Sequence, residues 1–398
     1  MNDLERIRER VIDVVRKAGR GHLGTSLSSL EAILAIRDTM RPGDIFLSSK
    51  GHDAAAQYVV LAEHGLLDES RLDTFRQSGG LPGHPTLDVP GIVANTGSLG
   101  MGLSKALGFA LGHKRTVFVL LGDGEMMEGQ NWEAALAISK QGVRNIIAVV
   151  DCNGFGQDGP APLSNIKIER MFKAAGWYVL SVSDGNNYEK IHTALQYAAW
   201  LTSIGPVVIV MKTVKGNGVP EFAGQWFSHF GPPGVKFPPH PLYAAFGGAV
   251  EKVMEDDPKV ILVGADTLRD LCCYELKDEF PERVFDFGIA EQNAVSFASA
   301  RALMGQKPIV ATYACFLRRA FEQIYNQVTE YTQVVYVGSM AGPLPDTGPG
   351  ISHESLDDDR YMGNLMPVNE LVSGEDPYSV LVEALSAGGP SYMRLLHG

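Results

Sequence analysis

The residues with the clearest chemical potential follow two buried apolar runs in the second quarter of the chain. Asp123 lies between Gly122 and Gly124 at the end of one run, and Asn153 follows the next run. Ligands bind at the carboxyl ends of parallel strands, and glycines let the backbone approach an anion closely. A carboxylate, an amide oxygen and the carbonyl of Phe155 suit Mg²⁺, which adds phosphate oxygens and water. The pattern favours a magnesium–diphosphate site over two ordinary strand-end turns, although Asp-Gly and Asn-Gly are common turn pairs.

The elements that must position these residues are parallel strands alternating with helices. Continuous apolar runs are typical of strands covered on both faces. Such runs occupy residues 117–121, 146–150, 178–182 and 206–211 and, in a second series, residues 260–263, 308–311, 334–337 and 392–395. Between the two series lies GQWFSHFGPPGVKFPPHP, which has no regular period and is interpreted as a linker with functional contacts. The predicted fold class is therefore α/β, with two domains that each hold a mainly parallel sheet covered by helices.

Composition and net charge limit the kinds of partner that the protein can bind. The 398 residues suffice for two or three domains, and the net charge of −12 argues against nonspecific binding to nucleic acid or to an anionic membrane. The N-terminal MNDLERIRERVIDVVRKAGRGH is an amphipathic helix pattern rather than a signal peptide, and no run is long enough to span a membrane. Four cysteines without metal-ligand spacing fit a reducing, cytoplasmic location. Lys212 and Lys215 are interpreted as loop charges.

Many segments resemble, in order, those of the transketolase family. Residues 117–159 are similar to the family's thiamine diphosphate signature. Its diphosphate-binding domain is also similar to GRGHLGTSLSSLEAILAI, LSSKGHDAAAQYVVLAEHG, GGLPGHP, NTGSLGMGLSKALGFALG, MKTVKGNGV and SHFG. The opening of its pyrimidine-binding domain resembles DFGIAEQNAVSFASARALMGQKPIVATYACFLRRAFEQI. The resemblance implies a diphosphate-binding domain at 1–230, a linker at 231–242 and a pyrimidine-binding domain at 243–398. Both domains would have the thiamine diphosphate-binding fold, with thiamine diphosphate and Mg²⁺ as cofactors.

The resemblance assigns cofactor roles in both domains. Glu291 in GIAEQNAV matches the glutamate that hydrogen-bonds the pyrimidine ring and so generates the base that deprotonates the thiazolium. The alternative is a helix-start glutamate that interacts with the N-terminal dipole. Phe316 matches the aromatic residue that stacks on the pyrimidine, with Tyr313 beside it, and Leu99 matches the apolar support of the bent cofactor. The remaining implied cofactor contacts are His52, Ser98, Gly122, Gly124, Glu125, Asn153 and His229.

Three further histidines match residues that line the family's substrate channel. They are His22, His84 and His353, and the resemblance implies that they bond donor hydroxyls and move protons. Surface or hydrogen-bonded structural histidines are the alternative. After His229, the chain has Phe230 where the family usually has glycine, which leaves the placement of His229 open.

Two arginines match positions that meet a sugar phosphate in parts of the family. They are Arg319 in FLRRAFEQ and Arg394 in YMRLL, and the guanidinium fork suits phosphate. Arg318 competes for the role of Arg319. In PLPDTGPGISHESLDDDR, Pro349 stands where the family has aspartate, and the nearest aspartate is Asp346. This loop is remodelled near the donor hydroxyls, which leaves the identity of the substrate open.

The chain ends where the family's pyrimidine-binding domain would end, so we expect the third, C-terminal domain of family members of usual size to be absent. That domain contributes to the dimer, and its absence predicts an exposed apolar surface and a second subunit that covers it. The resemblance also implies a homodimer with shared sites and a sugar phosphate donor. Similar pairs in some antibiotic pathways pass a two-carbon ketol unit to a thiol, so we expect the partner to carry a lipoyl or carrier domain.

Three functions remain open at this point. The first is transfer of a two-carbon ketol unit from a ketose phosphate to a carrier thiol or an aldose phosphate. The second is a decarboxylating carboligase that uses a 2-oxoacid, because GIAEQ and FLRRA also resemble deoxyxylulose phosphate synthases. The third is a non-catalytic protein that only binds the cofactor. Such a protein has no physical need for Asp123, Asn153 and Glu291 together with Phe316, so the first reading is favoured.

Overall fold

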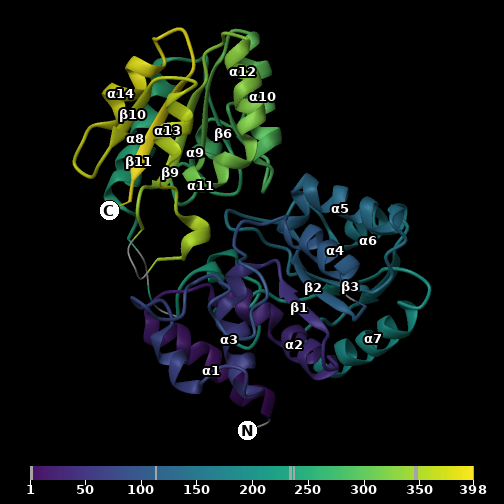
Figure 1. Ribbon diagram of the computed structural model, residues 1–398. Helices are drawn as coiled ribbons and strands as arrows, with labels where there is room; N and C mark the ends of the chain where they lie inside the picture. The colour runs from purple at the N-terminus through teal and green to yellow at the C-terminus, as the bar shows by residue number, and fades with distance from the viewer. Residues whose placement is uncertain (1–2, 113, 233–234, 236–237, 345–347, 398) are drawn as a thin grey trace. The chain divides into compact units, whose positions relative to one another are not determined.

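The computed structural model describes residues 3–112, 114–232, 235, 238–344 and 348–397. These residues form two compact units (Figure 1). The first unit consists of the described residues up to 235 together with 348–352, and the second consists of 238–344 and 353–397. No helix in these ranges is long and apolar enough to cross a membrane.

The first unit holds a five-stranded parallel sheet. Its strand order is β1 (Ile45–Ser48), β2 (Val117–Gly122), β3 (Ile146–Cys152), β5 (Val207–Lys212) and β4 (Tyr178–Val182). One face packs on α1 (Asp3–Ala18), α2 (Leu23–Thr39), α3 (Ala54–Glu63) and α7 (Tyr188–Leu201). The other face packs on α4 (Gly102–Gly112), α5 (Gly129–Lys140) and α6 (Asn165–Ala174).

Residues of β2 show why these strands are continuous apolar runs. Phe118 and Leu120 join the core beneath α2 and α3, whereas Val117, Val119 and Leu121 join the core beneath α4 and α5. Because successive side chains point to opposite faces and helices cover both faces, no position in the strand is left for a polar side chain.

The second unit holds a six-stranded parallel sheet. Its strand order is β10 (Val368–Leu371), β11 (Ser391–Leu396), β9 (Val335–Ala341), β8 (Lys307–Tyr313), β6 (Val260–Gly264) and β7 (Val284–Asp286). One face packs on α8 (Pro241–Asp256), α9 (Leu276–Glu279) and α14 (Pro377–Ala384). The other packs on α10 (Glu291–Leu303), α12 (Phe321–Thr329) and α13 (Asp358–Gly363), and the short α11 (Ala314–Leu317) follows β8.

The predicted fold class is confirmed, since both sheets are parallel and covered by helices. All eight predicted strands are present with ends shifted by at most two residues, except that β9 runs four residues further, to Ala341, and the N-terminal amphipathic pattern forms α1. The sequence reading missed β1, β7 and β10. These strands have three or four residues each, and β10 is largely exposed or half-buried. Runs this short give no apolar period to detect.

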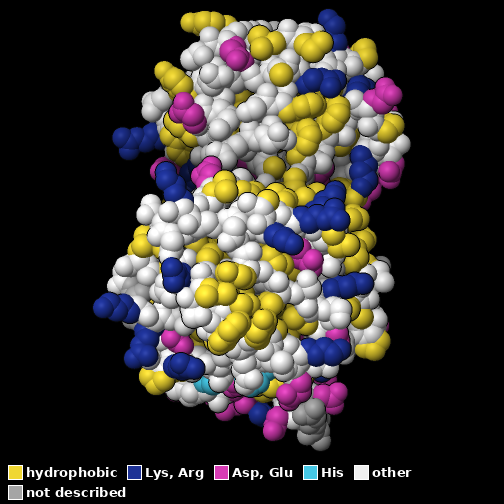
Figure 2. Space-filling view, turned by 90° about the vertical axis from the view of Figure 1, so that its right-hand side faces the viewer, with side chains coloured by type: hydrophobic (Ala, Val, Ile, Leu, Met, Phe, Trp, Pro, Cys, Tyr) yellow, Lys and Arg dark blue, Asp and Glu magenta, His cyan; other side chains and the backbone are white. Residues whose placement is uncertain are grey.

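Each unit exposes large apolar side chains on its helices. Leu111, Leu136 and Ile166 lie on α4, α5 and α6, and Leu303 and Tyr325 lie on α10 and α12. Figure 2 shows hydrophobic side chains gathered in patches on the face it presents. Patches of this kind are typical of surfaces that meet another protein.

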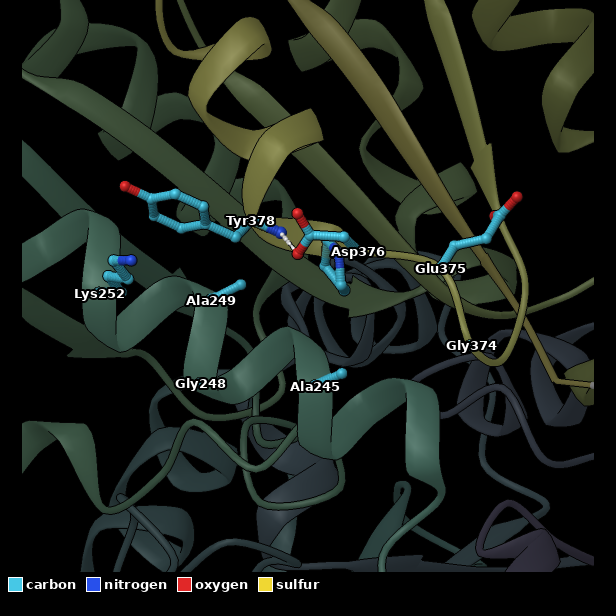
Figure 3. Close-up of a pocket in the computed structure, with 9 residues that line it drawn as sticks. Ala245, Gly248, Ala249, Lys252, Gly374, Glu375, Asp376 and Tyr378 are labelled. Atoms are coloured by element: carbon cyan, nitrogen blue, oxygen red, sulfur yellow. Dashed lines mark hydrogen bonds between the residues drawn. The ribbon is translucent and has the colours of Figure 1, made fainter.

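A pocket of about 570 Å³ lies in the second unit between α8 and the loop before α14 (Figure 3). Its charged groups hold the loop in place. The carboxylate of Asp376 accepts from the backbone N–H of Tyr378 at 3.1 Å, Glu375 Oε2 accepts from Val372 N at 2.8 Å, and Lys252 Nζ lies 4.3 Å from the Tyr378 ring centroid. These contacts fix the loop that lines the pocket, so the charged residues there have a structural role.

Candidate active site

The predicted metal ligands follow adjacent strands of the first unit. β2 pairs with β3 in parallel, with Gly122 opposite Asp151. Asp123 follows β2, and its Oδ2 accepts a hydrogen bond from the backbone N–H of Gly154 at 2.7 Å, directly after Asn153. The structure therefore brings Asp123 and Asn153 to one edge of the sheet.

These side chains offer oxygen ligands in a buried setting. Asp123 Oδ1 accepts from Gly124 N at 2.9 Å, and Asn153 Oδ1 accepts from Phe155 N at 3.1 Å. Burial, with the nearby charge of Asp151, raises the pKa of Asp123 to about 7. A buried carboxylate of this kind is stabilised by a cation, because the cation offsets its loss of hydration.

A buried ion pair that sequence reasoning missed lies beneath these residues. Lys50 Nζ pairs with Asp151 Oδ2 and donates to Ser29 Oγ at 2.7 Å, and Ser28 Oγ donates to the same carboxylate at 2.6 Å. Burial disfavours the charged form of Asp151, but the Lys50 charge and these hydrogen bonds outweigh it and lower the pKa. The sequence feature that could have indicated this ion pair is Lys50 in LSSKGHD, two residues after the end of β1.

The interpretation of Lys215 as a loop charge was wrong. Its side chain is fully buried, and Nζ donates to the carbonyl of Gly156 at 2.7 Å and lies 6.0 Å from the Phe155 ring centroid. Lys215 therefore adds positive charge beside the loop that carries Asn153 and Phe155. Lys212, by contrast, is exposed at the end of β5.

Four histidines of the first unit form a cluster, which we call the histidine cluster: His22, His52, His84 and His229. The ring centroid of His22 lies 5.2 Å from that of His84, 5.3 Å from that of His229 and 5.9 Å from that of His52. Burial is the main cause that lowers the pKa of all four, that of His84 to about 4. All four are therefore neutral at pH 7 and act as hydrogen-bonding groups.

The tautomer of His84 follows from one contact. Its Nδ1 lies 2.7 Å from the carbonyl oxygen of Pro349, which can only accept. Nδ1 therefore carries the proton, and Nε2 is an acceptor. This contact places Pro349, the departure from the family pattern, against a predicted substrate-channel histidine. Asp346, the nearest aspartate in that loop, lies outside the described residues.

Phe230 packs directly on the histidine cluster. Its ring centroid lies 4.7 Å from that of His22 and 4.8 Å from that of His229. The segment is tied to the loop before α2, because Gly231 N donates to Gly21 O at 2.7 Å. Phe230, which stands where the family usually has glycine, thus leaves His229 within the histidine cluster and adds an apolar ring at the edge of that cluster.

The loop with Ser98 and Leu99 packs tightly against the loop with His52. A Cβ on Gly51 would lie 2.6 Å from Gly97 N, so only glycine allows this approach. Glu125 joins this loop to the end of β2, since its carboxylate accepts from Gly100 N at 2.7 Å and Gly122 N at 3.1 Å. Its role as a cofactor contact stays a prediction.

In the second unit, Glu291 is the first residue of α10 and is buried. Its Oε2 receives no hydrogen bond from any described residue, and the closest cation, Arg319 Nη1, lies 3.8 Å away. Burial raises the pKa of Glu291 to about 7. A carboxyl group that keeps its proton near neutral pH can donate a hydrogen bond to a ligand.

Aromatic rings lie at the carboxyl end of β8. Tyr313 ends this strand, and its ring stacks on Phe316 of α11 with centroids 5.2 Å apart and an interplanar angle of 22°. His353 lies 5.1 Å from the Phe316 ring centroid. The Tyr313 hydroxyl donates to Asp270. The second unit therefore brings together Tyr313, Phe316 and His353.

Arg394, predicted to meet a sugar phosphate, lies in an ion-pair network of the second unit, and its phosphate role stays a prediction. Its Nε donates to Asp358 Oδ2 at 2.9 Å and its Nη1 to Glu370 Oε2 at 2.6 Å, and the side chain is buried in β11. Two carboxylates already neutralise the guanidinium, so it stabilises the second unit. Sequence reasoning could not detect this, because both acids lie on other elements. Arg319 keeps its predicted role.

The sequence matches two family descriptions in succession. Residues 2–236 match "Transketolase, thiamine diphosphate binding domain", and residues 241–395 match "Transketolase, pyrimidine binding domain". The chain therefore belongs to the transketolase family, and its first unit is a thiamine diphosphate-binding domain of that family.

Relatives support the assignment over most of the chain. Transketolase-like protein 2 of Mus musculus is 32% identical over 421 residues, covering 89% of this chain and 66% of that protein. One of the subunits of the apulose-4-phosphate transketolase of Phocaeicola vulgatus is 35% identical over 247 residues, covering 58% of this chain and 87% of that protein. The solved structure of transketolase from Leishmania mexicana shares the fold, with a TM-score of 0.54 at 20% identity, covering 98% of this chain and 75% of that one. The chain thus spans about two thirds of the length of the full-length transketolases it matches.

Proposed function

We propose that this protein transfers a two-carbon ketol unit from a ketose phosphate, using thiamine diphosphate and Mg²⁺. The observation that carries the proposal is Glu291, a buried carboxyl group with an unbonded oxygen and a raised pKa at the start of α10. A buried polar atom without a hydrogen bond is costly, and a bound ligand can supply the partner. The cofactor named for the family supplies that partner in its pyrimidine ring.

The first unit holds the charged end of the cofactor in this proposal. Asp123, Asn153 and the carbonyl of Phe155 would bind Mg²⁺, because Asp123 and the loop that carries Asn153 and Phe155 follow adjacent strands and are hydrogen-bonded to each other. His52 and His229 contact the diphosphate. The buried Nδ1 of His229 receives no hydrogen bond from the described residues, which fits a ligand contact there. Gly122, Gly124 and Ser98 let the backbone approach the phosphates.

The second unit holds the pyrimidine end. Glu291 would hydrogen-bond a ring nitrogen, Phe316 would stack on the ring, and Leu99 would support the bent shape. When bound, thiamine diphosphate supplies the carbanion and the electron sink for the reaction. The protein would position the proton of Glu291 and keep water from the ring.

Substrate hydroxyls are bound by His22, His84 and His353 in this proposal, and the phosphate by Arg319. The neutral state of His22 and His84 supports this role, because an unprotonated Nε2 of His84 accepts a hydrogen bond from a hydroxyl. A neutral histidine can also take up a proton during the reaction and return it later.

We propose that the active assembly is a homodimer joined by a second subunit that provides a third domain. One relative is named as a single subunit of a transketolase, and the exposed apolar side chains of α4, α5 and α10 fit such contacts. The partner presents the acceptor, which is an aldose phosphate or a thiol on a lipoyl or carrier domain. The domain limits 1–230, 231–242 and 243–398 belong to this proposal.

The test is mass spectrometry of the cofactor after the loaded protein is incubated with a donor. Fructose 6-phosphate should leave a two-carbon hydroxylated adduct, and pyruvate should leave none. The Glu291→Gln variant should show the adduct only at a much lower rate. An adduct from pyruvate alone would identify a decarboxylating carboligase, and no adduct from either donor would identify a non-catalytic subunit.

The assembly is tested by sedimentation and donor cleavage with and without the candidate partner. We expect the chain alone to bind the cofactor and cleave donor but to turn over slowly. A monomer that turns over rapidly on aldose acceptors by itself would contradict both the shared sites and the partner.

A further inference from the structure

A second cavity lies in the first unit, at the opposite edge of its sheet from Asp123. The cavity has a volume of about 670 Å³ and lies between the end of α2, the second half of α7 and the start of β2. Asp44 and Thr116 line it and directly precede β1 and β2, whereas Asp123 directly follows β2. Because the six residues of β2 span about 20 Å, the cavity is separate from the metal site proposed above. A volume of this size suits a small-molecule ligand.

The loops before β1 and β2 contribute three cations to the cavity: Arg41, Lys114 and Arg115. Asp44 holds these two loops together, because its Oδ2 accepts from Arg41 N at 2.8 Å and its Oδ1 accepts from Thr116 N at 3.0 Å. Cations gathered in this way attract an anionic group, and guanidinium and ammonium groups both bind phosphate. This is a local departure from the net charge of −12 of the whole chain.

Helix α7 contributes an aromatic platform to the same cavity. The indole of Trp200 is 61% exposed, and it stacks on the ring of Tyr197 with centroids 5.6 Å apart and an interplanar angle of 14°. Gln196, about one helical turn before Trp200, also lines the cavity, and its amide both donates and accepts hydrogen bonds. An exposed ring with a hydrogen-bonding amide on the same helix face suits a flat heterocyclic base.

The two carboxylates at the cavity, Asp38 and Asp44, are engaged within the fold. Asp38 Oδ2 accepts from the Tyr188 hydroxyl at 2.7 Å, and its Oδ1 lies 3.0 Å from His64 Nε2. These contacts join the end of α2 to α7 and to the end of α3. Both carboxylates oppose an anion, but the three cations outnumber them, and the hydrogen bonds that each carboxylate accepts partly compensate its charge.

We propose that this cavity binds a nucleoside diphosphate. Its phosphates contact the three cations, and its base stacks on Trp200 with Gln196 at the edge of the base. A simple anion would use the cations and leave the platform bare, and an uncharged aromatic ligand would leave the cations unused. A ligand that joins a flat ring to an anionic group uses both. The inference is independent of the proposed function, since none of these residues belongs to the cofactor or substrate sites proposed above.

The experiment is titration calorimetry with ADP, adenosine and inorganic phosphate as probes. The full chain is first saturated with thiamine diphosphate and Mg²⁺, so that ADP cannot enter the proposed cofactor site. We expect one ADP to bind per chain. Adenosine and phosphate should each bind at least about tenfold more weakly, because each has only one of the two recognised parts.

Two variants assign the binding to this cavity. In Arg41→Gln, the affinity for ADP should fall about 10- to 100-fold, the usual loss for a hydrogen-bonded charge. In Trp200→Ala, it should fall about 5- to 100-fold, the usual loss for a stack of a base on an aromatic ring. Arg170→Gln is the matched control, an exposed arginine on α6 that should leave the affinity unchanged. ADP binding that thiamine diphosphate abolishes, phosphate binding as tight as that of ADP, or unchanged ADP affinity in both variants would each overturn the inference.

Discussion

Two buried acids, Asp151 of the first unit and Glu291 of the second, are held in different ways. In the first, the carboxylate of Asp151 is paired with Lys50 and accepts from Ser28, and the carboxylate of Asp123 accepts two backbone N–H groups. In the second, Glu291 has an oxygen without a hydrogen bond, and its nearest cation is 3.8 Å away. Asp151 is thus neutralised by its neighbours, whereas Glu291 keeps an oxygen without a hydrogen bond.

The difference fits the two tasks that we propose for these residues. A metal and diphosphate carry high charge, so they need a rigid frame, and the network around Asp151 fixes the ends of β2 and β3. The pyrimidine ring of the proposed cofactor needs a proton donor, so the acid must stay protonated near neutral pH, and the burial of Glu291 favours its protonated form.

The largest effect should come from removing the proton of Glu291. In Glu291→Gln, thiamine diphosphate should bind within a few-fold of wild type, because size and burial are kept. Exchange of the cofactor's C2 proton should slow by about 10²- to 10⁴-fold, the usual contribution of a general acid or base. Proton NMR in D₂O measures this exchange. Wild-type exchange in the variant would remove Glu291 from the mechanism.

Breaking the Lys50–Asp151 pair should destabilise the protein next most strongly. Lys50→Met leaves Asp151 buried and unpaired, which costs about 3–5 kcal/mol of unfolding free energy. Urea denaturation measures the change. Lys212→Met, at an exposed position on the same sheet, is the control and should stay within about 0.5 kcal/mol. Adding Asp151→Leu to Lys50→Met should restore part of the stability, and no recovery would show that the loss has another cause.

Asp123→Ala should remove the charged metal ligand. Mg²⁺ would then no longer be held against the diphosphate, and the affinity for thiamine diphosphate should fall at least about a hundredfold, close to 3 kcal/mol. Titration calorimetry at fixed Mg²⁺ measures this. The control is Asp184→Ala, because Asp184 also precedes a glycine after a strand of the same sheet but pairs with Lys190. Similar losses in both variants would contradict a specific metal site.

Sequence reasoning could predict the strands and the residues at their ends, because burial on both faces produces continuous apolar runs and parallel strands place their ends together. It placed Asp123 and Asn153 from this pattern alone. It could not predict that Lys50 pairs with Asp151, or that Arg394 pairs with Asp358, because such partners are distant in sequence and depend on packing. The same limit applies to Lys215, whose charge type suggested exposure although the fold buries it, and to Phe230, whose contact with His22 joins distant loops.

The smallest expected effect is on stability, and it tests the pKa of Glu291 directly. The pKa of about 7 in the folded, cofactor-free protein lies above the ordinary value of 4.5. Between these values the unfolded chain loses the proton while the folded protein retains it, so the wild type loses stability as pH rises through this window. Glutamine does not titrate. The stability of Glu291→Gln relative to wild type should therefore increase by about 1–3 kcal/mol from pH 5 to pH 8, measured by urea denaturation at both values. Glu322→Gln, an exposed control on α12, should show no such change. A difference between Glu291→Gln and wild type that is the same at both pH values would mean that Glu291 ionises normally, and the contrast between the two units would then fail at its most specific point.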